Sequence, residues 1–118
     1  MAAQMKQIST HVLDLTLGKP ASNTPVRLER EESSGKWRVL KTARTDHDGR
    51  CPQLLPDEDD LPPGVYKLTF GTGDYYREQK TEALYPSIEV RFLVKEGQTH
   101  FHIPLLLSPN GYTTYRGN

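Results

Sequence analysis

Hydrophobic and polar residues alternate along most of this chain, in short runs separated by turn-forming residues. In the first run, Ile8 and Val12 fall on one face of an extended strand, while Ser9 and His11 fall on the other. A run with this period of two buries one face and leaves the other partly exposed. We therefore predict strands over the following segments: residues 7–16, 25–31, 36–43, 65–70 and 86–94.

The last twenty residues carry an unusual number of functional side chains. His100 and His102 point to one side of a predicted strand, with Phe101 and Ile103 on the other. Residues 104–107 are apolar at every position, which is typical of a strand covered on both faces. Residues 108–111 (Ser-Pro-Asn-Gly) favour a turn, and the β-prone residues 112–115 follow. The pattern predicts a docked terminal hairpin.

Helical periodicity is restricted to one short stretch, where Asp74 is placed to cap a helix extending to Leu84. Seven to eight short strands, abundant turn residues and one short helix are typical of an all-β protein. We therefore predict an antiparallel β-sandwich. The length of 118 residues fits one domain, which we place at residues 8–118 after a flexible N-terminal segment, residues 1–7.

Charge and composition exclude several classes of function. Fifteen basic and fifteen acidic residues give a formal net charge of zero, which argues against binding to nucleic acid. No apolar run has the length of a membrane span, and residues 1–7 lack the apolar centre of a signal peptide. We expect a soluble, cytoplasmic protein. The single Cys51 excludes an intrachain disulfide and a cysteine-based zinc site.

The four histidines are the main candidates for chemistry, because the chain has no Gly-x-Ser-x-Gly motif. His100 and His102, with His11 from another strand, have residue types that can bind zinc. Alternatively, all three are polar strand residues whose hydrogen bonds are satisfied by backbone or water. Neutral imidazole also transfers protons efficiently near pH 7. The residues alone leave these three interpretations open. His47 has no motif around it, and we expect it in a loop.

Several blocks of sequence, spread from Ile8 to Gly117, resemble the signature motifs of the transthyretin-related 5-hydroxyisourate hydrolases of purine catabolism. The closing Tyr-Arg-Gly motif is the most specific, since it separates these hydrolases from the hormone carrier transthyretin. Asn118 departs from the pattern, because the family normally ends in serine. The blocks are Ser9-Thr-His-Val-Leu-Asp14, Gly18-Lys-Pro-Ala21, Thr45-Asp-His-Asp-Gly-Arg50, His100-Phe-His-Ile-Pro-Leu-Leu-Leu-Ser108 and Tyr112-Thr-Thr-Tyr-Arg-Gly117.

The resemblance implies a transthyretin-like β-sandwich that forms a homotetramer, a dimer of dimers with active sites at the dimer–dimer interface. It implies hydrolytic ring opening of 5-hydroxyisourate to 2-oxo-4-hydroxy-4-carboxy-5-ureidoimidazoline in urate degradation, with no cofactor and no metal. The catalytic residues it implies are His11, Arg50 and His102. The substrate-binding residues it implies are His11, Arg50, Tyr115, Arg116 and Gly117.

Two other classes of function share the same fold. A carrier of apolar aromatic ligands would need apolar or small residues where this chain has His11, His102 and Tyr115. A purely structural sandwich would leave the histidine-rich tail without a role. Single residues also have alternative roles: Arg50 as an anchor of the Asp48-Gly49 turn through neighbouring carboxylates, and Arg116 in a salt bridge across a subunit interface.

Overall fold

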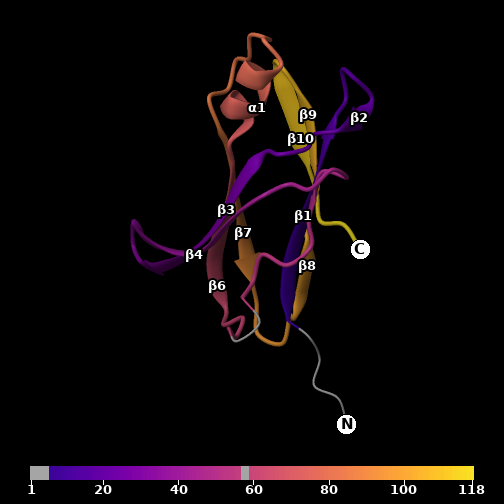
Figure 1. The fold of residues 1–118 in the computed structure, drawn as a ribbon. Coiled ribbons are helices and arrows are strands. Elements are labelled where there is room, and N and C mark those ends of the chain that lie inside the picture. The colour runs from indigo at the N-terminus through magenta and orange to yellow at the C-terminus, as the bar shows by residue number, and fades with distance from the viewer. Residues whose placement is uncertain (1–5, 57–58) are drawn as a thin grey trace.

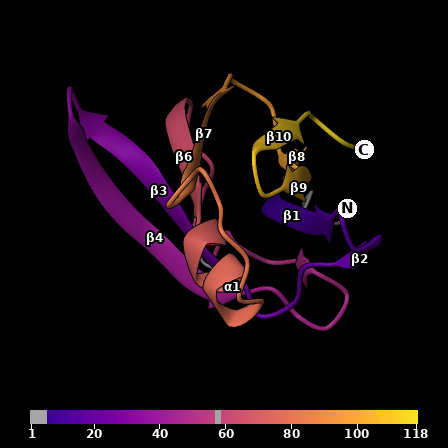
Figure 2. The same cartoon turned by 90° about the horizontal axis from the view of Figure 1, so that it is seen from above.

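The computed structural model describes residues 6–56 and 59–118, and its strands form two sheets that pack as layers (Figures 1 and 2). The first sheet has the order β10-β9-β1-β2, with β5 and β8 also paired to β1. Its strands are β1 (Gln7–Asp14), β2 (Lys19–Pro20), β5 (Arg50–Cys51), β8 (His100–His102), β9 (Leu105–Ser108) and β10 (Gly111–Thr114).

The second sheet has the order β4-β3-β6-β7, and all of its pairings are antiparallel. Its strands are β3 (Pro25–Ser33), β4 (Lys36–Arg44), β6 (Gly64–Phe70) and β7 (Ile88–Val94). In the first sheet, β1 runs parallel to β8 and β9. The β-sandwich predicted from the alternating pattern is confirmed, with this parallel arrangement inside a mostly antiparallel structure.

Strand β1 follows the predicted alternation from Ile8 to Asp14. Ile8 and Val12 are fully buried in the core between the sheets, whereas Ser9 and His11 are half-buried on the outer face. The core also takes large side chains from the facing sheet, such as Leu28. Burying these apolar side chains holds the sheets together, so the polar face of β1 must turn away from the core.

The terminal hairpin is confirmed, although its first strand is interrupted. Strands β8 and β9 are separated at Ile103 and Pro104, because proline has no N–H to donate to the neighbouring strand. Strands β9 and β10 then pair antiparallel, and the Ser108 hydroxyl donates to the carbonyl of Gly111 across the turn at 3.0 Å. Leu106 is only half-buried within one chain, so the expected cover on both faces is not met here.

The helix differs from the sequence prediction. Helix α1 spans Thr72–Glu78, and Gly71 at its N-cap provides no side-chain hydrogen bond. Asp74 lies inside the first turn, where its carboxylate accepts a hydrogen bond from Arg77 at 2.7 Å. The helix stops before Lys80, which adopts a positive φ of 55°. The predicted cap at Asp74 and the extension to Leu84 are therefore wrong.

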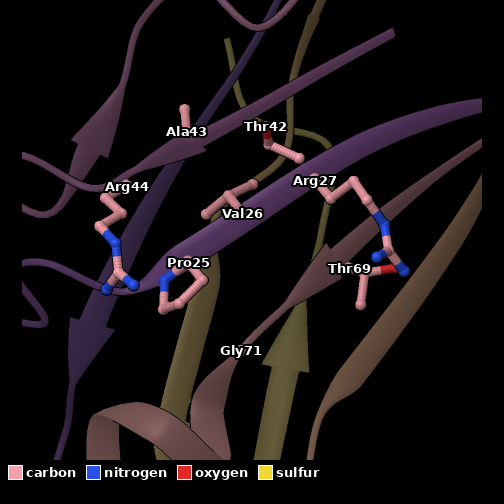
Figure 3. Close-up of a pocket in the computed structure, with 8 residues that line it drawn as sticks. All are labelled: Pro25, Val26, Arg27, Thr42, Ala43, Arg44, Thr69 and Gly71. Carbon is pink, nitrogen blue, oxygen red and sulfur yellow. The ribbon is translucent and has the colours of Figure 1, made fainter. Parts of the chain in front are cut away.

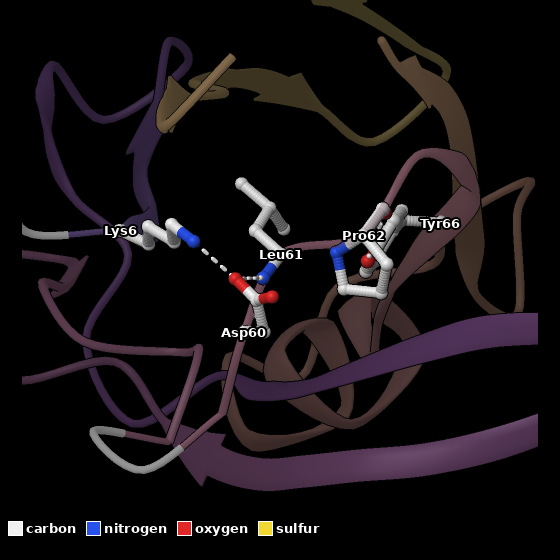
Figure 4. Close-up of polar contacts among 5 residues, drawn as sticks. All are labelled: Lys6, Asp60, Leu61, Pro62 and Tyr66. Carbon is white, nitrogen blue, oxygen red and sulfur yellow. Dashed lines mark hydrogen bonds and ion pairs between the residues drawn. The ribbon is translucent and has the colours of Figure 1, made fainter. Parts of the chain in front are cut away.

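Contacts at the lower end of the sandwich in Figure 1 fix the start of β1 (Figure 4). Lys6 forms an ion pair with Asp60, whose carboxylate also accepts the backbone N–H of Leu61 at 2.9 Å. Residues 1–5 of the expected flexible segment lie outside the described residues, and Gln7 already belongs to β1. Within the described residues, no helix is both long enough and apolar enough to cross a membrane.

Candidate active site

Two strand pairings bring the predicted catalytic side chains to one face of the first sheet. The antiparallel pairing of β1 with β5 sets His11 opposite Arg50. The parallel pairing of β1 with β8 sets Ser9 opposite His102. Directly paired residues share a face of a sheet, and Ser9 and His11 both lie on the outer face of β1. The structure therefore brings His11, Arg50 and His102 together, from three strands that are far apart in the sequence.

A cavity of about 250 Å³ opens on this face, with His102 and Arg50 in its wall. His100 also lines it but is exposed at the beginning of β8, as a residue at the rim would be. The full lining consists of Ser9, Thr10, Arg50, Pro52, His100, His102 and Asn118. The cavity wall is therefore rich in hydrogen-bonding and basic groups, which suits a small polar ligand better than an apolar one.

The imidazole of His102 is held in a defined orientation and is biased toward its neutral form. Its Nδ1 atom lies 2.8 Å from the hydroxyl oxygen of Ser9. Partial burial lowers the pKa of His102 below its ordinary value of 6.5, and the positive charge of Arg50 and the neighbouring imidazoles of His11 and His100 act in the same direction. A neutral imidazole near pH 7 is able to accept a proton.

Arg50 is positioned through its backbone, which leaves its side chain available. The Asp46 carboxylate accepts the backbone N–H groups of Asp48 and Arg50, both at 2.9 Å. The hydrogen bond from Arg50 is the main reason that the pKa of Asp46 is lowered. Among the described residues, no carboxylate forms an ion pair with the Arg50 guanidinium. The turn is therefore anchored by the main chain of Arg50, and not by the side chain that the alternative interpretation required.

Gly49 allows the loop before β5 to approach β1 closely. It has a positive φ of 76°, and a Cβ atom at this position would lie 2.4 Å from the carbonyl oxygen of Val12. Only glycine fits without strain at such a position. The turn predicted at Asp48-Gly49 is confirmed, and it delivers Arg50 to the strand beside His11.

Residues of the C-terminal tail lie at two separate sites on the surface. The N–H of Gly117 donates to the carbonyl of His102 at 2.7 Å, so Gly117 lies beside the candidate site. The Arg116 guanidinium instead stacks 4.2 Å from the ring centre of Phe101 and donates to the His100 carbonyl at 3.0 Å. With Tyr115, it lines a separate cavity of about 210 Å³. Within one chain, Tyr115 and Arg116 are therefore not brought to His102.

Ser9 is a residue of the candidate site that the sequence interpretation missed. It contacts His102 directly and lines the same cavity. A signal was present, because Ser9 precedes His11 by two residues and so shares its face of β1. Its partner could not be identified, since the parallel register of β1 and β8 joins segments separated by 93 residues.

The zinc interpretation gains no support from the described residues. In that part of the chain, the one group of three potential ligands whose atoms lie within 4.8 Å of one another is Asp46, His47 and Asp48. All three are exposed, and Asp46 already accepts two backbone hydrogen bonds. His47 is the loop residue that the sequence predicted.

A larger cavity of about 640 Å³ lies on the other sheet (Figure 3). It contains no histidine and no carboxylate, and its lining residues are Pro25, Val26, Arg27, Thr42, Ala43, Arg44, Thr69 and Gly71. The Nε atom of Arg27 is bonded to Glu29 at 3.1 Å, and Arg44 donates to the carbonyl of Asn23. Groups for proton transfer are absent from this lining, so cavity size alone does not locate the candidate site.

Comparison with known proteins gives a consistent result over nearly the whole chain. A family model described as the HIUase/Transthyretin family matches residues 8–117. The 5-hydroxyisourate hydrolase of Mus musculus is 45% identical over 119 residues, which covers 100% of both chains. The structure of Klebsiella pneumoniae 5-hydroxyisourate hydrolase has a TM-score of 0.83 and 34% identity, covering 97% of this chain and 100% of that one. Sea bream transthyretin in complex with thyroxine has a TM-score of 0.86 and 32% identity, covering 93% of each chain.

Proposed function

The chain belongs to the HIUase/transthyretin family, and from this premise we propose that it is a hydrolase that opens the ring of 5-hydroxyisourate in urate degradation. The product would be 2-oxo-4-hydroxy-4-carboxy-5-ureidoimidazoline. The observation that carries the proposal is the convergence of His11, Arg50 and His102 on one face of the first sheet. The names of its relatives support the same activity.

The chemistry of the reaction requires three things from the protein. Water must be positioned against a planar acyl carbon, one of its protons must be accepted, and negative charge must be stabilised on the carbonyl oxygen. A neutral His102 can accept the proton. The guanidinium of Arg50, which is always protonated, can hold the substrate and stabilise the oxyanion. These roles agree with the lowered pKa of His102 and with the Arg50 side chain having no carboxylate partner among the described residues.

In the proposed reaction, the oxygen of water forms a bond to the ring acyl carbon while His102 takes a proton from that water. Arg50 stabilises the tetrahedral oxyanion. The carbon–nitrogen bond then breaks, and the ring nitrogen leaves with a proton supplied by the His102 and His11 pair. The new carboxylic acid releases its remaining proton to solvent. These reaction steps balance in atoms and charge without a cofactor or a metal ion.

We further propose a homotetramer, a dimer of dimers with the sites at the dimer–dimer interface. Leu15 and Leu17 are 58% and 52% exposed, and Leu106 is half-buried on the same face as the candidate site. Edge strands β7 and β10 also expose apolar side chains. Large apolar side chains left exposed on a single chain favour cover by another copy.

Assembly would also give the tail residues a role in binding. Tyr115 and Arg116 are both exposed in the single chain and lie away from their own His102 cavity. We propose that they contact substrate across the subunit contact, while Gly117 contributes beside His102 in the same chain. Sedimentation equilibrium should give a mass close to four times 13.4 kDa. The variant Leu17→Glu should lower this mass and the activity together, and a monomeric but fully active wild-type protein would contradict the proposed assembly.

The activity is tested with freshly prepared 5-hydroxyisourate, made by oxidising urate with urate oxidase and followed by its ultraviolet absorbance. The protein should accelerate decay of that absorbance at low concentration. His102→Ala and Arg50→Ala should each reduce turnover by roughly a hundredfold or more while the fold is retained. His47→Ala is the matched control, because His47 is an exposed loop residue. Near-normal turnover by His102→Ala would contradict the assigned role.

The alternative function in the same family is a carrier, since sea bream transthyretin is solved with thyroxine. The imidazole and guanidinium groups around the cavity argue against an apolar aromatic ligand. Tight binding of thyroxine, together with no acceleration of ring opening, would favour the carrier. The cytoplasmic location expected from the sequence stays a prediction.

A further inference from the structure

The His102 ring is contacted on two opposite edges, and among the described residues one side chain makes a polar contact with it. Ser9 Oγ lies 2.8 Å from Nδ1. On the other edge, the backbone of Gly117 approaches so closely that a Cβ atom there would lie 2.8 Å from Cδ2. These two contacts leave the edge with Nε2 as the one that can face a water or a substrate.

The position of the Ser9 hydroxyl is fixed by the backbone around it. The carbonyl of Ser9 accepts the N–H of Ile103 at 2.9 Å, which locks the register of β1 against the segment after β8. The next residue, Thr10, faces the interior, and its hydroxyl donates to the Ile103 carbonyl at 2.6 Å. These hydrogen bonds fix the backbone of Ser9 against the segment that follows His102, so the Ser9 hydroxyl needs only its side-chain rotamer to reach Nδ1.

The direction of this hydrogen bond decides what His102 can do. Neutral imidazole carries its proton on one nitrogen and a lone pair on the other. If Ser9 donates to Nδ1, then Nε2 carries the proton and cannot act as a base. If Ser9 accepts from Nδ1–H, then Nε2 carries the lone pair. After proton transfer both nitrogens are donors, so an accepting Ser9 stays satisfied throughout the cycle, whereas a donating Ser9 would have to rotate.

We propose that Ser9 is a positioning residue whose hydroxyl accepts the Nδ1–H of His102, and thereby fixes the tautomer in which Nε2 takes a proton from the attacking water. This inference rests on the proposed hydrolase function. The same arrangement, an acceptor holding one ring nitrogen so that the other can act as a base, is used by other enzymes whose histidine is a general base. Arg50, His11 and His100 are the charged or titratable groups that influence the His102 ring from the surrounding strands.

The direct test is the tautomer of His102, read by long-range nitrogen–proton NMR on protein labelled with ¹⁵N-histidine. The chain has four histidines, and the His102→Gln spectrum assigns the signal of interest. We expect wild-type His102 to be protonated at Nδ1. Ser9→Ala should shift the population toward the Nε2–H form, and Ser9→Thr, which keeps a hydroxyl, should restore the wild-type pattern.

Kinetics give a second measurement on the same variants. Ser9→Ala should reduce kcat about tenfold with KM changed less than about twofold, because the hydroxyl acts on proton transfer and not on binding. Ser34→Ala, in the exposed β3–β4 turn, is the control, and thermal melting checks that each variant is folded. An Nε2–H tautomer in the wild type, or a tautomer unchanged by Ser9→Ala, would overturn the inference.

Failure of the proposed hydrolase function and failure of the inference about Ser9 give different experimental results. The NMR measurement needs no substrate, so the tautomer can be established even if the wild-type protein does not open the ring of 5-hydroxyisourate. Inactive wild-type protein with an Nδ1–H tautomer would count against the hydrolase. Active wild-type protein with an Nε2–H tautomer would count against the role of Ser9 alone.

Discussion

Replacing Gly117 by alanine tests whether the tail holds the His102 ring in place. A Cβ atom at this position would lie 2.8 Å from His102 Cδ2 and 3.3 Å from Pro104 Cγ. Carbon atoms in favourable contact are about 3.5 Å or more apart, so the ring or the tail must shift. Gly117 does not have a positive φ, and therefore the expected effect is steric and not conformational.

The magnitude follows from the required displacement. The overlap with the His102 ring is about 0.7 Å relative to a normal carbon–carbon contact, and overpacking of this kind costs about 1–3 kcal/mol. A misplacement of about 1 Å at a catalytic group can reduce the rate by roughly a hundredfold. We therefore expect Gly117→Ala to lower kcat by roughly tenfold to a hundredfold. For a chain of 118 residues, the same cost should lower the melting temperature by roughly 4–12 °C.

The assay is stopped-flow absorbance of freshly prepared 5-hydroxyisourate, with kcat and KM obtained for each protein. Gly111→Ala is the matched control in the same hairpin, since a Cβ atom there would meet Ser108 Oγ at an ordinary 3.7 Å. The control should retain wild-type rates. If Gly117→Ala keeps more than about half of the wild-type kcat, the tail does not position His102 and the reasoning is refuted.

Two further predictions follow from the pKa of His102 and from one buried hydrogen bond. The pKa of His102 is lowered from 6.5 by burial and by the charge of Arg50, so kcat/KM should fall with acidification only below pH 6.5. Arg50→Gln should move this acidic limb of the pH profile to higher pH. A wild-type acidic limb above pH 6.5 would contradict the assignment of His102 as the base. Tyr75→Phe removes the buried hydrogen bond from Tyr75 Oη to the Asp14 carboxylate at 2.6 Å, which should lower the free energy of unfolding by about 1–3 kcal/mol in urea titrations with turnover unchanged. The exposed Tyr85→Phe is its control, and equal midpoints for the two variants would contradict a stabilising role.

Local periodicity was sufficient to predict the parts of the fold that depend on neighbouring residues. The alternation around Ile8 and Val12 identified the buried face of β1 correctly. The Asp48-Gly49 turn is also predicted correctly, because Asp-Gly is a local turn signal whose glycine can adopt the positive φ of 76° found here. The helix was misplaced because Asp74 is a good cap by residue type, but the backbone turned at Gly71 instead.

Long-range register could not be read from the sequence. His11, Arg50 and His102 were selected by a resemblance, and only the pairings of β1 with β5 and β8 explain why they meet. The contact of Ser9 with His102 depends on a parallel register between distant strands. The position of Arg116 against Phe101 depends on how the tail packs in one chain, which residue type alone does not determine.

In the proposed site, His11 and His102 act as one unit on a single water. Turnover of 5-hydroxyisourate by His11→Ala, His102→Ala and the double variant, measured as a double-mutant cycle, tests this shared role. If the two imidazoles act as a unit, the double variant should lie within about threefold of the slower single variant. If the two losses multiply instead, the histidines act independently and do not share one water.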